Sequence, residues 1–236
     1  MKPNQLRASN AIKALYATMI TMTITSIAAY VLLYMISSAS MNFEDMGSYL
    51  GQIQTYSIFA GIFGLIHLGI YITCIVLFIM WFRRAYFNLH NLVPHNRLKY
   101  SEGWAAGTWF IPIFNLFGPF QIATDLFSQS EKLLVEKGLM EKQPKYHQVK
   151  GWWWGLWIAS IVLNQVSRNT EDVSIVMFSI VLGILILLAT IGAGLLAIQM
   201  IKNYSKMEEL LKKIPLEEGG IATSIITNDD LLDSGI

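Results

Sequence analysis

The sequence predicts an all-α fold: a polytopic membrane helix bundle with four spanning helices and one broken segment that re-enters the membrane or lies at its surface. Hydrophobic residues make up 54% of the 236 residues and charged residues only 14%, whereas an average soluble domain has about 25% charged residues. Several uncharged runs approach or exceed the roughly 20 residues that a spanning helix needs. The distribution of Lys and Arg then indicates which of these runs cross the membrane.

Five apolar segments are candidate spans, at residues 14–36, 56–82, 104–124, 151–169 and 173–200. The first follows three cations and has 23 residues. It is therefore longer than the apolar core of a cleaved signal peptide, which has about 7–15 residues, and we interpret it as a retained span. The fourth has an apolar run of only 16 residues and reaches a full span by including residues 167–169. Local bilayer thinning is the alternative.

The positive-inside rule decides between the possible topologies, because Lys and Arg concentrate in cytoplasmic connections. If all five segments crossed, the 17 cations would divide almost evenly, eight inside and nine outside. If residues 104–124 enter and leave on the same side, 16 of the 17 lie inside. The sequence therefore predicts four crossings, with both termini in the cytoplasm.

The third segment carries its own signs of a break. Pro112 removes an amide donor and clashes with the preceding helical turn, and Gly118-Pro119 is a turn signal, with Asn115 between them. Broken backbone at membrane depth must be buried in protein or face water. We therefore expect other helices to pack around this segment. The alternative is an ordinary spanning helix with a proline kink.

Residues 121–137 place apolar side chains on one face and charged side chains on the other. This pattern predicts an amphipathic helix at the cytoplasmic surface of the membrane. We expect one transmembrane helical domain over residues 1–202. Residues 203–236 are expected to form a cytoplasmic tail that is largely disordered, with a short amphipathic stretch at its start and an acidic end.

The candidate structural or binding residues share two features: they lie at the predicted membrane boundary or within the broken segment. Tryptophans at such a boundary anchor a helix at headgroup level, or they form a wall for a lipid or another apolar ligand. The arginines that end the second span either contact lipid phosphates or bond Asp125 or Asn115 and hold the broken segment. The full set is Arg83, Arg84, Asn88, Trp104, Trp109, Pro112, Asn115, Pro119, Asp125, Trp152 and Trp153.

Composition excludes several classes of function. A net charge of +1 argues against a nucleic-acid binder, which carries a basic patch or stripe. The single cysteine, Cys74, lies in an apolar run and cannot form an intrachain disulfide or a cysteine zinc site. His67 has no histidine or carboxylate with it inside a span, and phosphate-binding loops and catalytic motifs are absent. We expect no metal, no cofactor and no catalytic residue.

Five blocks of sequence are specific when taken together. They are Arg83-Arg-Ala-x-x-Asn88-Leu, Gly103-Trp-x-x-Gly-x-Trp-Phe-Ile-Pro112-x-x-Asn115-Leu, Pro119-Phe, Asp125-Leu and Gly151-Trp-Trp-Trp-x-Leu-Trp157. Over roughly residues 14–200 the chain resembles the bacterial membrane proteins grouped as domain of unknown function 4328. The resemblance implies a multi-helix protein of the bacterial cytoplasmic (inner) membrane. It implies no activity and does not extend to the acidic tail.

Three functions remain open. The first is a non-enzymatic membrane module that binds membrane lipids or a protein partner, and the absence of a catalytic constellation favours it. The second is a small transporter or channel component with the broken segment on a substrate path, which with four spans requires a homo-oligomer. The third is a membrane enzyme acting on lipid headgroups, with Asp125, Asn115, Arg83 or Arg84 at the inner surface.

Overall fold

The structure is a computed structural model that describes residues 1–39, 46–168 and 176–214. Within these ranges it contains helices and turns and no strand. The elements in chain order are α1 (Gln5–Ala39), α2 (Met46–His90), η2 (His95–Arg97), α3 (Trp104–Gly107), η3 (Phe114–Leu116), α4 (Gly118–Glu136), α5 (Pro144–Arg168) and α6 (Val176–Leu211). The predicted all-α class is confirmed.

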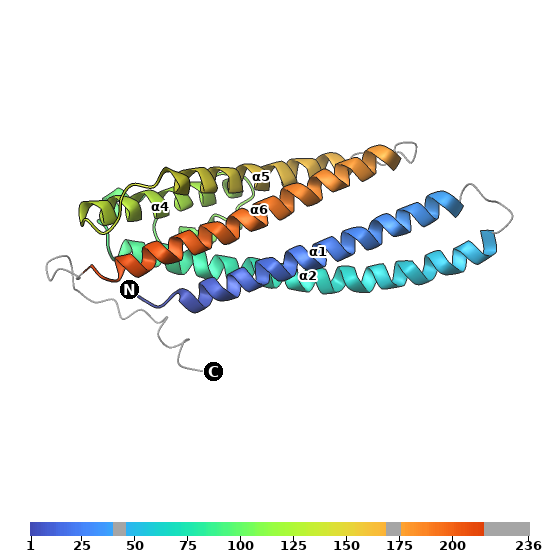
Figure 1. Ribbon diagram of the computed structural model, residues 1–236, viewed down its shortest axis with the longest axis horizontal. Helices are drawn as coiled ribbons and strands as arrows, with labels where there is room; N and C mark the ends of the chain where they lie inside the picture. The colour runs from blue at the N-terminus through green and yellow to red at the C-terminus, as the bar shows by residue number, and fades with distance from the viewer. Residues whose placement is uncertain (40–45, 169–175, 215–236) are drawn as a thin grey trace.

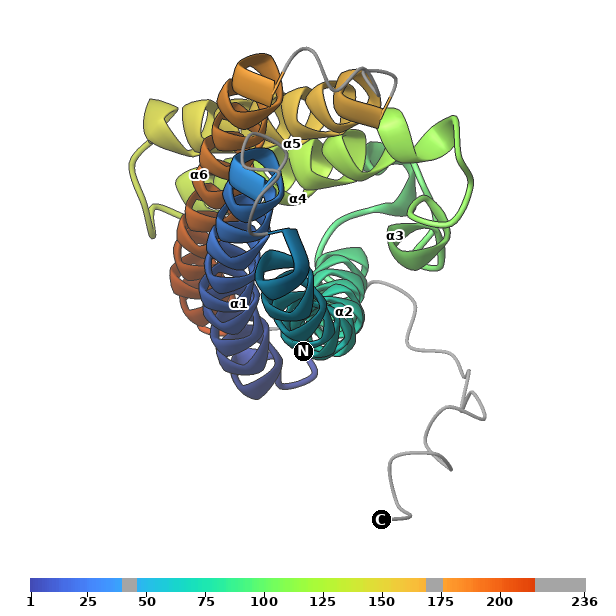
Figure 2. The same cartoon turned by 90° about the vertical axis from the view of Figure 1, so that its right-hand side faces the viewer.

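Two long antiparallel helix pairs form the frame (Figure 1). Helix α1 packs along α2, and α5 packs along α6, while α1 also contacts α6 and so joins the two pairs. Helix α1 begins and α6 ends at the same end of the molecule, where α4 lies between the pairs (Figures 1 and 2). The predicted spans 14–36, 56–82, 151–169 and 173–200 correspond to these four helices, which extend beyond several of the predicted bounds.

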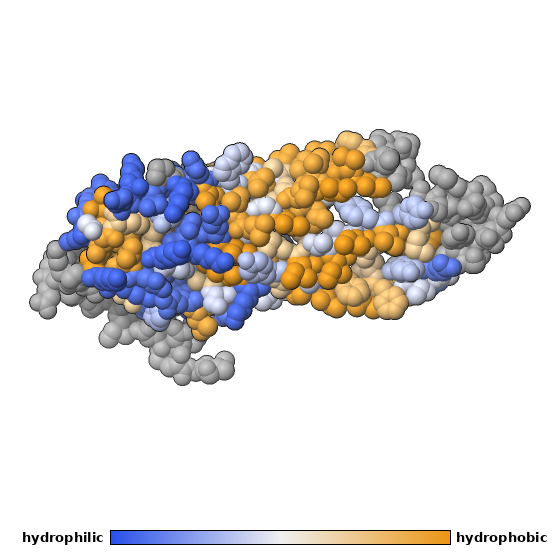
Figure 3. All heavy atoms as spheres, viewed as in Figure 1, coloured by the Kyte–Doolittle hydropathy of each residue, from blue (hydrophilic) through white to orange (hydrophobic). Residues whose placement is uncertain are grey.

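The two halves of the molecule differ in polarity. The half that contains the start of α1, the end of α6 and helix α4 is largely hydrophilic on the face shown in Figure 3, and the other half is largely hydrophobic. In the hydrophobic half, large apolar side chains such as Ile58, Leu65 and Leu188 are exposed. An apolar surface of this extent is unfavourable in water and is the surface expected of helices in lipid.

The packed core lies mainly in the hydrophilic half. Its largest fully buried side chains come from the end of α2, from α4 and from the end of α6, namely Trp81, Phe82, Tyr86, Leu89, Ile122, Leu126, Phe127, Leu134, Met200, Ile201, Tyr204 and Met207. Burial of apolar area from water stabilises by about 25 cal/mol per Å², and helices in lipid gain little from it. The hydrophilic half therefore holds the core that defines the helix arrangement.

Among the described residues, three helical stretches are long and apolar enough to cross a membrane, within Gln5–Leu32, Leu50–His90 and Phe178–Leu211. Helix α5 is not among them. Its 25 residues are long enough, but it has a polar first turn, four tryptophans and a polar pair, Asn164 and Gln165, near its end. These residues lower its hydropathy. The chain is thus a multi-pass membrane protein with three clear candidate spans.

The environment of α4 differs from the prediction for residues 121–137. The helix is amphipathic, but Ile122, Leu126, Phe127 and Leu134 on its apolar face are buried in the protein core instead of facing lipid. Gly138 ends the helix with a φ of 68°, and the Leu139 amide donates to the Leu134 carbonyl at 2.9 Å. This is the hydrogen bond of a Schellman motif, which favours glycine at that position.

The boundary predicted at residue 203 is wrong. Helix α6 continues to Leu211, and Tyr204, Met207 and Leu211 are buried in the core. The amphipathic stretch predicted at the start of the tail is therefore the last part of a core helix. The disorder predicted for the acidic end falls on residues 215–236, which lie outside the described residues.

The glycines of α6 allow close helix contact, whereas Gly61 and Gly64 of α2 face open space. A Cβ at Gly194 of α6 would lie 2.8 Å from the Met19 sulfur of α1, and one at Gly192 would lie 2.9 Å from Leu156 of α5. At Gly61 and Gly64 of α2 no atom lies within 4 Å of such a Cβ. The glycines of α6 therefore serve helix packing, as small residues often do in membranes, whereas these glycines of α2 have no such role within the chain.

Candidate functional site: the broken segment and its polar supports

The segment 104–124 is broken as predicted. The four-residue helix α3 ends at Gly107, irregular turns follow through Pro112, and the three-residue η3 precedes α4, which starts at Gly118. Local hydrogen bonds replace the regular helical ones: the Phe110 amide donates to the Gly107 carbonyl at 3.2 Å, and the Asn115 amide donates to the Ile111 carbonyl at 2.8 Å. Pro112 is exposed, and Pro119 is buried in the first turn of α4, where its missing amide costs nothing.

Trp109 fixes the broken segment to the bundle. Its ring lies 5.7 Å from the Phe78 ring of α2 and 6.0 Å from the Trp157 ring of α5, centroid to centroid, both in edge-on geometry. Edge-to-face aromatic pairs add about 0.5–1.5 kcal/mol to area burial. Phe78 and Trp157 stand where the apolar runs of α2 and α5 meet their charged flanks, so the segment lies at the boundary between the hydrophobic and hydrophilic halves.

The outer side of the segment is apolar and uncovered. Phe110 is 75% exposed and Ile113 is 76% exposed. Trp104 is 40% exposed, with its ring 5.3 Å from that of Phe114. The candidate tryptophans of α5 divide in the same way, since Trp152 is 68% exposed and Trp153 only 4%. The site thus has a buried aromatic floor and an exposed apolar rim.

Asn115 does not support the freed backbone with its side chain. Its side-chain oxygen is buried and has no hydrogen-bond partner among the described residues. The Thr108 hydroxyl oxygen, also on the segment, is likewise buried and without a partner in the described part of the chain. The breaks are instead stabilised by the backbone bonds above and by aromatic packing.

Asp125 holds the loop that leads into the broken segment. Its carboxylate accepts a hydrogen bond from the Lys99 backbone amide at 3.0 Å, and the Lys99 ammonium donates to the Gln121 side-chain oxygen at 2.8 Å. The Tyr100 hydroxyl donates to the same Gln121 oxygen. The pairing of Asp125 with Arg83 or Arg84, one of the two roles predicted for these arginines, stays a prediction.

Of the two arginines, Arg84 has described contacts with Phe87 and Glu208. Arg83 is exposed at the end of the apolar run of α2, and the Arg84 guanidinium lies 5.9 Å from the centre of the Phe87 ring. Arg84 also interacts electrostatically with Glu208 of α6. Their positions suit contact with the membrane surface, where arginine side chains reach lipid phosphates.

Asn88 belongs to a buried polar network that joins three parts of the chain. Its side-chain oxygen accepts from the Lys2 amide at 2.9 Å, and its amide nitrogen donates to the Lys2 carbonyl at 2.9 Å and to the Glu208 carboxylate at 2.6 Å. The Asn4 side chain donates to the other Glu208 oxygen at 3.3 Å. This network holds the N-terminal residues against α2 and α6, which makes Asn88 a structural residue.

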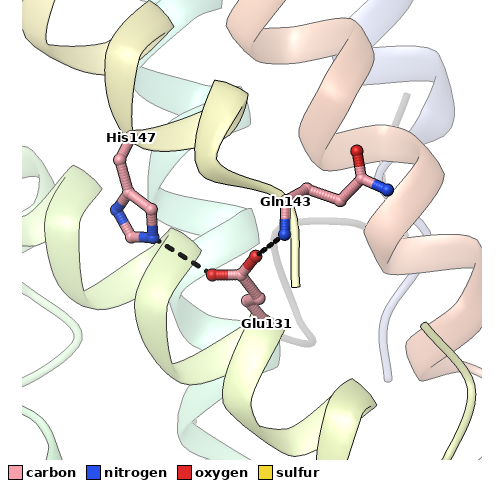
Figure 4. Close-up of polar contacts among 3 residues, drawn as sticks. All are labelled: Glu131, Gln143 and His147. Atoms are coloured by element: carbon pink, nitrogen blue, oxygen red, sulfur yellow. Dashed lines mark hydrogen bonds and ion pairs between the residues drawn. The ribbon is translucent and has the colours of Figure 1, made fainter. Parts of the chain in front are cut away.

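A second buried carboxylate ties α4 to the start of α5 (Figure 4). Glu131 of α4 accepts a hydrogen bond from the Gln143 backbone amide at 2.6 Å and pairs with the His147 Nε2 at 3.1 Å. The residue is 5% exposed. The Glu131 carboxylate therefore holds the start of α5, and the loop before it, against α4.

Lys150 is the third buried charge. It is 4% exposed, and its ammonium lies 5.4 Å from the centre of the Phe120 ring, in position for a cation–π contact. Burial lowers the pKa of Lys150, and the Asp125 carboxylate opposes part of that shift. Lys150 comes immediately before the Gly151-Trp-Trp-Trp run, so this charge also sits at the boundary.

Sequence reasoning missed Glu208, Glu131 and Lys150. Each stands in a polar helical stretch that resembles a solvated face, and burial becomes evident only when the neighbouring helices are placed. One usable signal was Glu208 beside Met207 and Leu211, at apolar spacing on α6. The described residues contain no group of three or more His, Cys, Asp or Glu side chains that could hold a metal ion.

Comparison with known proteins places the chain in a family without giving it an activity. A search of curated proteins and a search of solved structures found no match. A family model described as a domain of unknown function, DUF4328, matches residues 45–206. That range contains the broken segment, Asn88, Asp125 and the tryptophans of α5, and it covers more than half of the sequence. The chain therefore belongs to the DUF4328 family.

Proposed function

We propose that this chain is a non-enzymatic module of the bacterial inner membrane that binds lipid through its broken segment and presents a helical domain to a protein partner in the cytoplasm. The observation that carries the proposal is the exposed apolar rim, with Phe110 and Ile113 about three-quarters exposed at the boundary between the two halves. Water does not favour such a surface. Lipid at the inner leaflet covers it without requiring another protein.

The proposed topology has four crossings, with α5 as the fourth. Helix α5 runs antiparallel along α6, which supports a crossing of the same membrane by both. The cation distribution supports cytoplasmic termini, because 16 of the 17 Lys and Arg residues then lie inside. In this arrangement the hydrophilic half, with its packed core, projects into the cytoplasm as the protein-binding domain.

Cysteine accessibility tests the topology. Single cysteines at Asn96, Gln148 and Asn169 (the last outside the described residues) are introduced into a Cys74→Ala background, and intact cells are treated with a membrane-impermeant maleimide. Labelling at Asn169 alone is the expected result. Labelling at Gln148 would place the start of α5 outside the cell and would overturn both the topology and the cytoplasmic domain.

Depth-dependent quenching tests the lipid contact. A fluorophore on Ile113→Cys, in protein reconstituted into bilayers, is exposed to lipids brominated along their acyl chains. We expect strong quenching at residue 113 and little at a control fluorophore on Glu136→Cys, an exposed position of α4. Equal and weak quenching at both positions would show that the segment does not enter the leaflet.

A further inference from the structure

Two neighbouring hollows lie on the outer side of the loop that leads into the broken segment. The first, of about 450 Å³, is lined by His90, Asn91, Leu98, Lys99, Tyr100, Ser101 and Glu102. The second, of about 400 Å³, is lined by Ser101, Gly103, Trp104, Gly107 and Ile111. Ser101 lines both hollows, so they are adjacent along one surface.

The hollows differ in polarity. The first carries a cation, Lys99, and an anion, Glu102, three residues apart. The second is lined by Trp104, Ile111 and two glycines, together with Ser101. Ile111, which lines the second hollow, stands in the chain between the exposed Phe110 and Ile113, which the proposed function places in lipid. A molecule that fits both hollows has a headgroup of mixed charge and an apolar chain.

Among the described residues, no atom comes closer than ordinary contact to a Cβ placed on either glycine of the apolar hollow. Gly103 has a φ of −63° and a ψ of −28°, which any residue adopts, and no atom lies within 4 Å of a Cβ placed on it. Gly107 is helical, and a Cβ there would make only an ordinary contact at 3.7 Å with Trp104. Glycine is less favourable than alanine within a helix. Because Gly103 and Gly107 have no side chain, the hollow stays open.

We infer that these two hollows form a binding site for a phospholipid with a primary ammonium in its headgroup, of the phosphatidylethanolamine type. This inference rests on the proposed lipid contact of the broken segment. The Lys99 ammonium, which already donates to Gln121 at 2.8 Å, has further N–H groups for the phosphate. The Glu102 carboxylate accepts from the lipid ammonium, and one acyl chain lies against Trp104 and the two glycines.

The mixed charge of the polar hollow is what selects this class of lipid. A headgroup with a net negative charge, such as phosphatidylglycerol, leaves Glu102 without a cation and repels it. A quaternary ammonium, as in phosphatidylcholine, has no N–H to donate to the carboxylate. A charge-assisted hydrogen bond is roughly twice as strong as a neutral one, so the bond from a primary ammonium to Glu102 favours phosphatidylethanolamine over phosphatidylcholine. Repulsion by Glu102 disfavours phosphatidylglycerol.

Native mass spectrometry of the full chain in mild detergent tests the site. The protein is offered equal amounts of dioleoyl phosphatidylethanolamine, phosphatidylcholine and phosphatidylglycerol, and retained lipid is counted. We expect phosphatidylethanolamine to be preferred by about tenfold, which corresponds to about 1.4 kcal/mol. Glu102→Gln should abolish this preference, and Lys99→Gln should weaken retention of every phospholipid.

Gly103→Leu should block the apolar hollow and remove the retained lipid, and Gly103→Ala should do so partially. Gly61→Leu is the matched control, because no atom lies within 4 Å of its Cβ position either and it stands on α2 away from the hollows. Equal retention of the three lipids, or full retention by Gly103→Leu with an unchanged melting temperature, would overturn the inference. If the Ile113 fluorophore is quenched as expected while lipid selection is absent, the inference fails and the proposed function stands. If the fluorophore is not quenched, the proposed function fails.

Discussion

Asn88 and Glu208, which are 120 residues apart in the chain, meet in the core with the Asn88 amide nitrogen 2.6 Å from the Glu208 carboxylate. Both residues are at most 1% exposed. The same Asn88 side chain forms two hydrogen bonds with the Lys2 backbone. One side chain thus links α2, α6 and the N-terminal residues.

Removing that link should destabilise the protein. Asn88→Ala leaves the buried Glu208 carboxylate and the Lys2 backbone without these hydrogen bonds, and an orphaned buried group costs about 1–3 kcal/mol. We expect the melting temperature in detergent to fall by several degrees. Asn91→Ala, just after the end of α2 at an exposed position with a local bond to Phe87, is the control and should change little. Equal melting temperatures for the two variants would contradict a structural role for Asn88.

The Glu131 carboxylate should matter far more than its exposed neighbour. Glu131→Ala removes the acceptor of the Gln143 amide and the partner of His147 (Figure 4), so we expect a loss of about 1–3 kcal/mol. Glu136→Ala removes only an exposed pair with Lys132 at 4.0 Å, and pairs of that kind contribute about 0–1 kcal/mol. Chemical unfolding followed by tryptophan fluorescence compares the two, and similar losses would exclude the proposed link between α4 and α5.

Lys150 should make stability depend on pH in the alkaline range. Its pKa is lowered in the fold from the ordinary 10.5, so between the two pKa values the unfolded chain binds more protons than the folded chain. Stability then rises as pH increases through that window. We expect the wild type to gain stability relative to Lys150→Met as pH increases from neutral toward 10.5. Lys145→Met, at an exposed position of α5, is the matched control. A difference between wild type and Lys150→Met that stays constant with pH would refute the prediction.

Gly118 should tolerate no side chain. A Cβ there would lie 2.7 Å from the Thr108 Cγ2 and 2.8 Å from the Phe114 Cδ1, and overpacking of this kind costs about 1–3 kcal/mol. Gly118→Ala should therefore lower the melting temperature and loosen the broken segment, measurable as faster proteolysis. Gly155→Ala, a helical position with open space around its Cβ, should be neutral or slightly stabilising. Unchanged proteolysis of Gly118→Ala would mean that the segment packs differently.

For the tryptophan run of α5, the sequence pattern predicts the position at the membrane boundary but not which rings are buried. Its place at the membrane boundary follows from the flanking Lys150 and from the preference of tryptophan for the interface. Which rings face outward depends on the neighbours of the helix. Trp152 is exposed, whereas Trp153 packs against Phe78 with ring centroids 6.1 Å apart. Sequence alone could not separate two adjacent tryptophans, because the 100° between them on a helix has meaning only when the partner helices are placed.

The chain by itself determined its class, its apolar helices and the break near Pro112, because these depend on local hydropathy and on backbone chemistry that proline and glycine change wherever they occur. Tertiary structure alone decided that α4 is covered by protein, that α6 continues in the core to Leu211, and that Glu131, Lys150 and Glu208 are buried. Burial of a charge is settled by residues far away in sequence, which supply the hydrogen bonds and the apolar surroundings. The free-energy cost of burying a charge, and the interactions that offset it, are therefore properties of the assembled bundle. A local sequence pattern does not predict them.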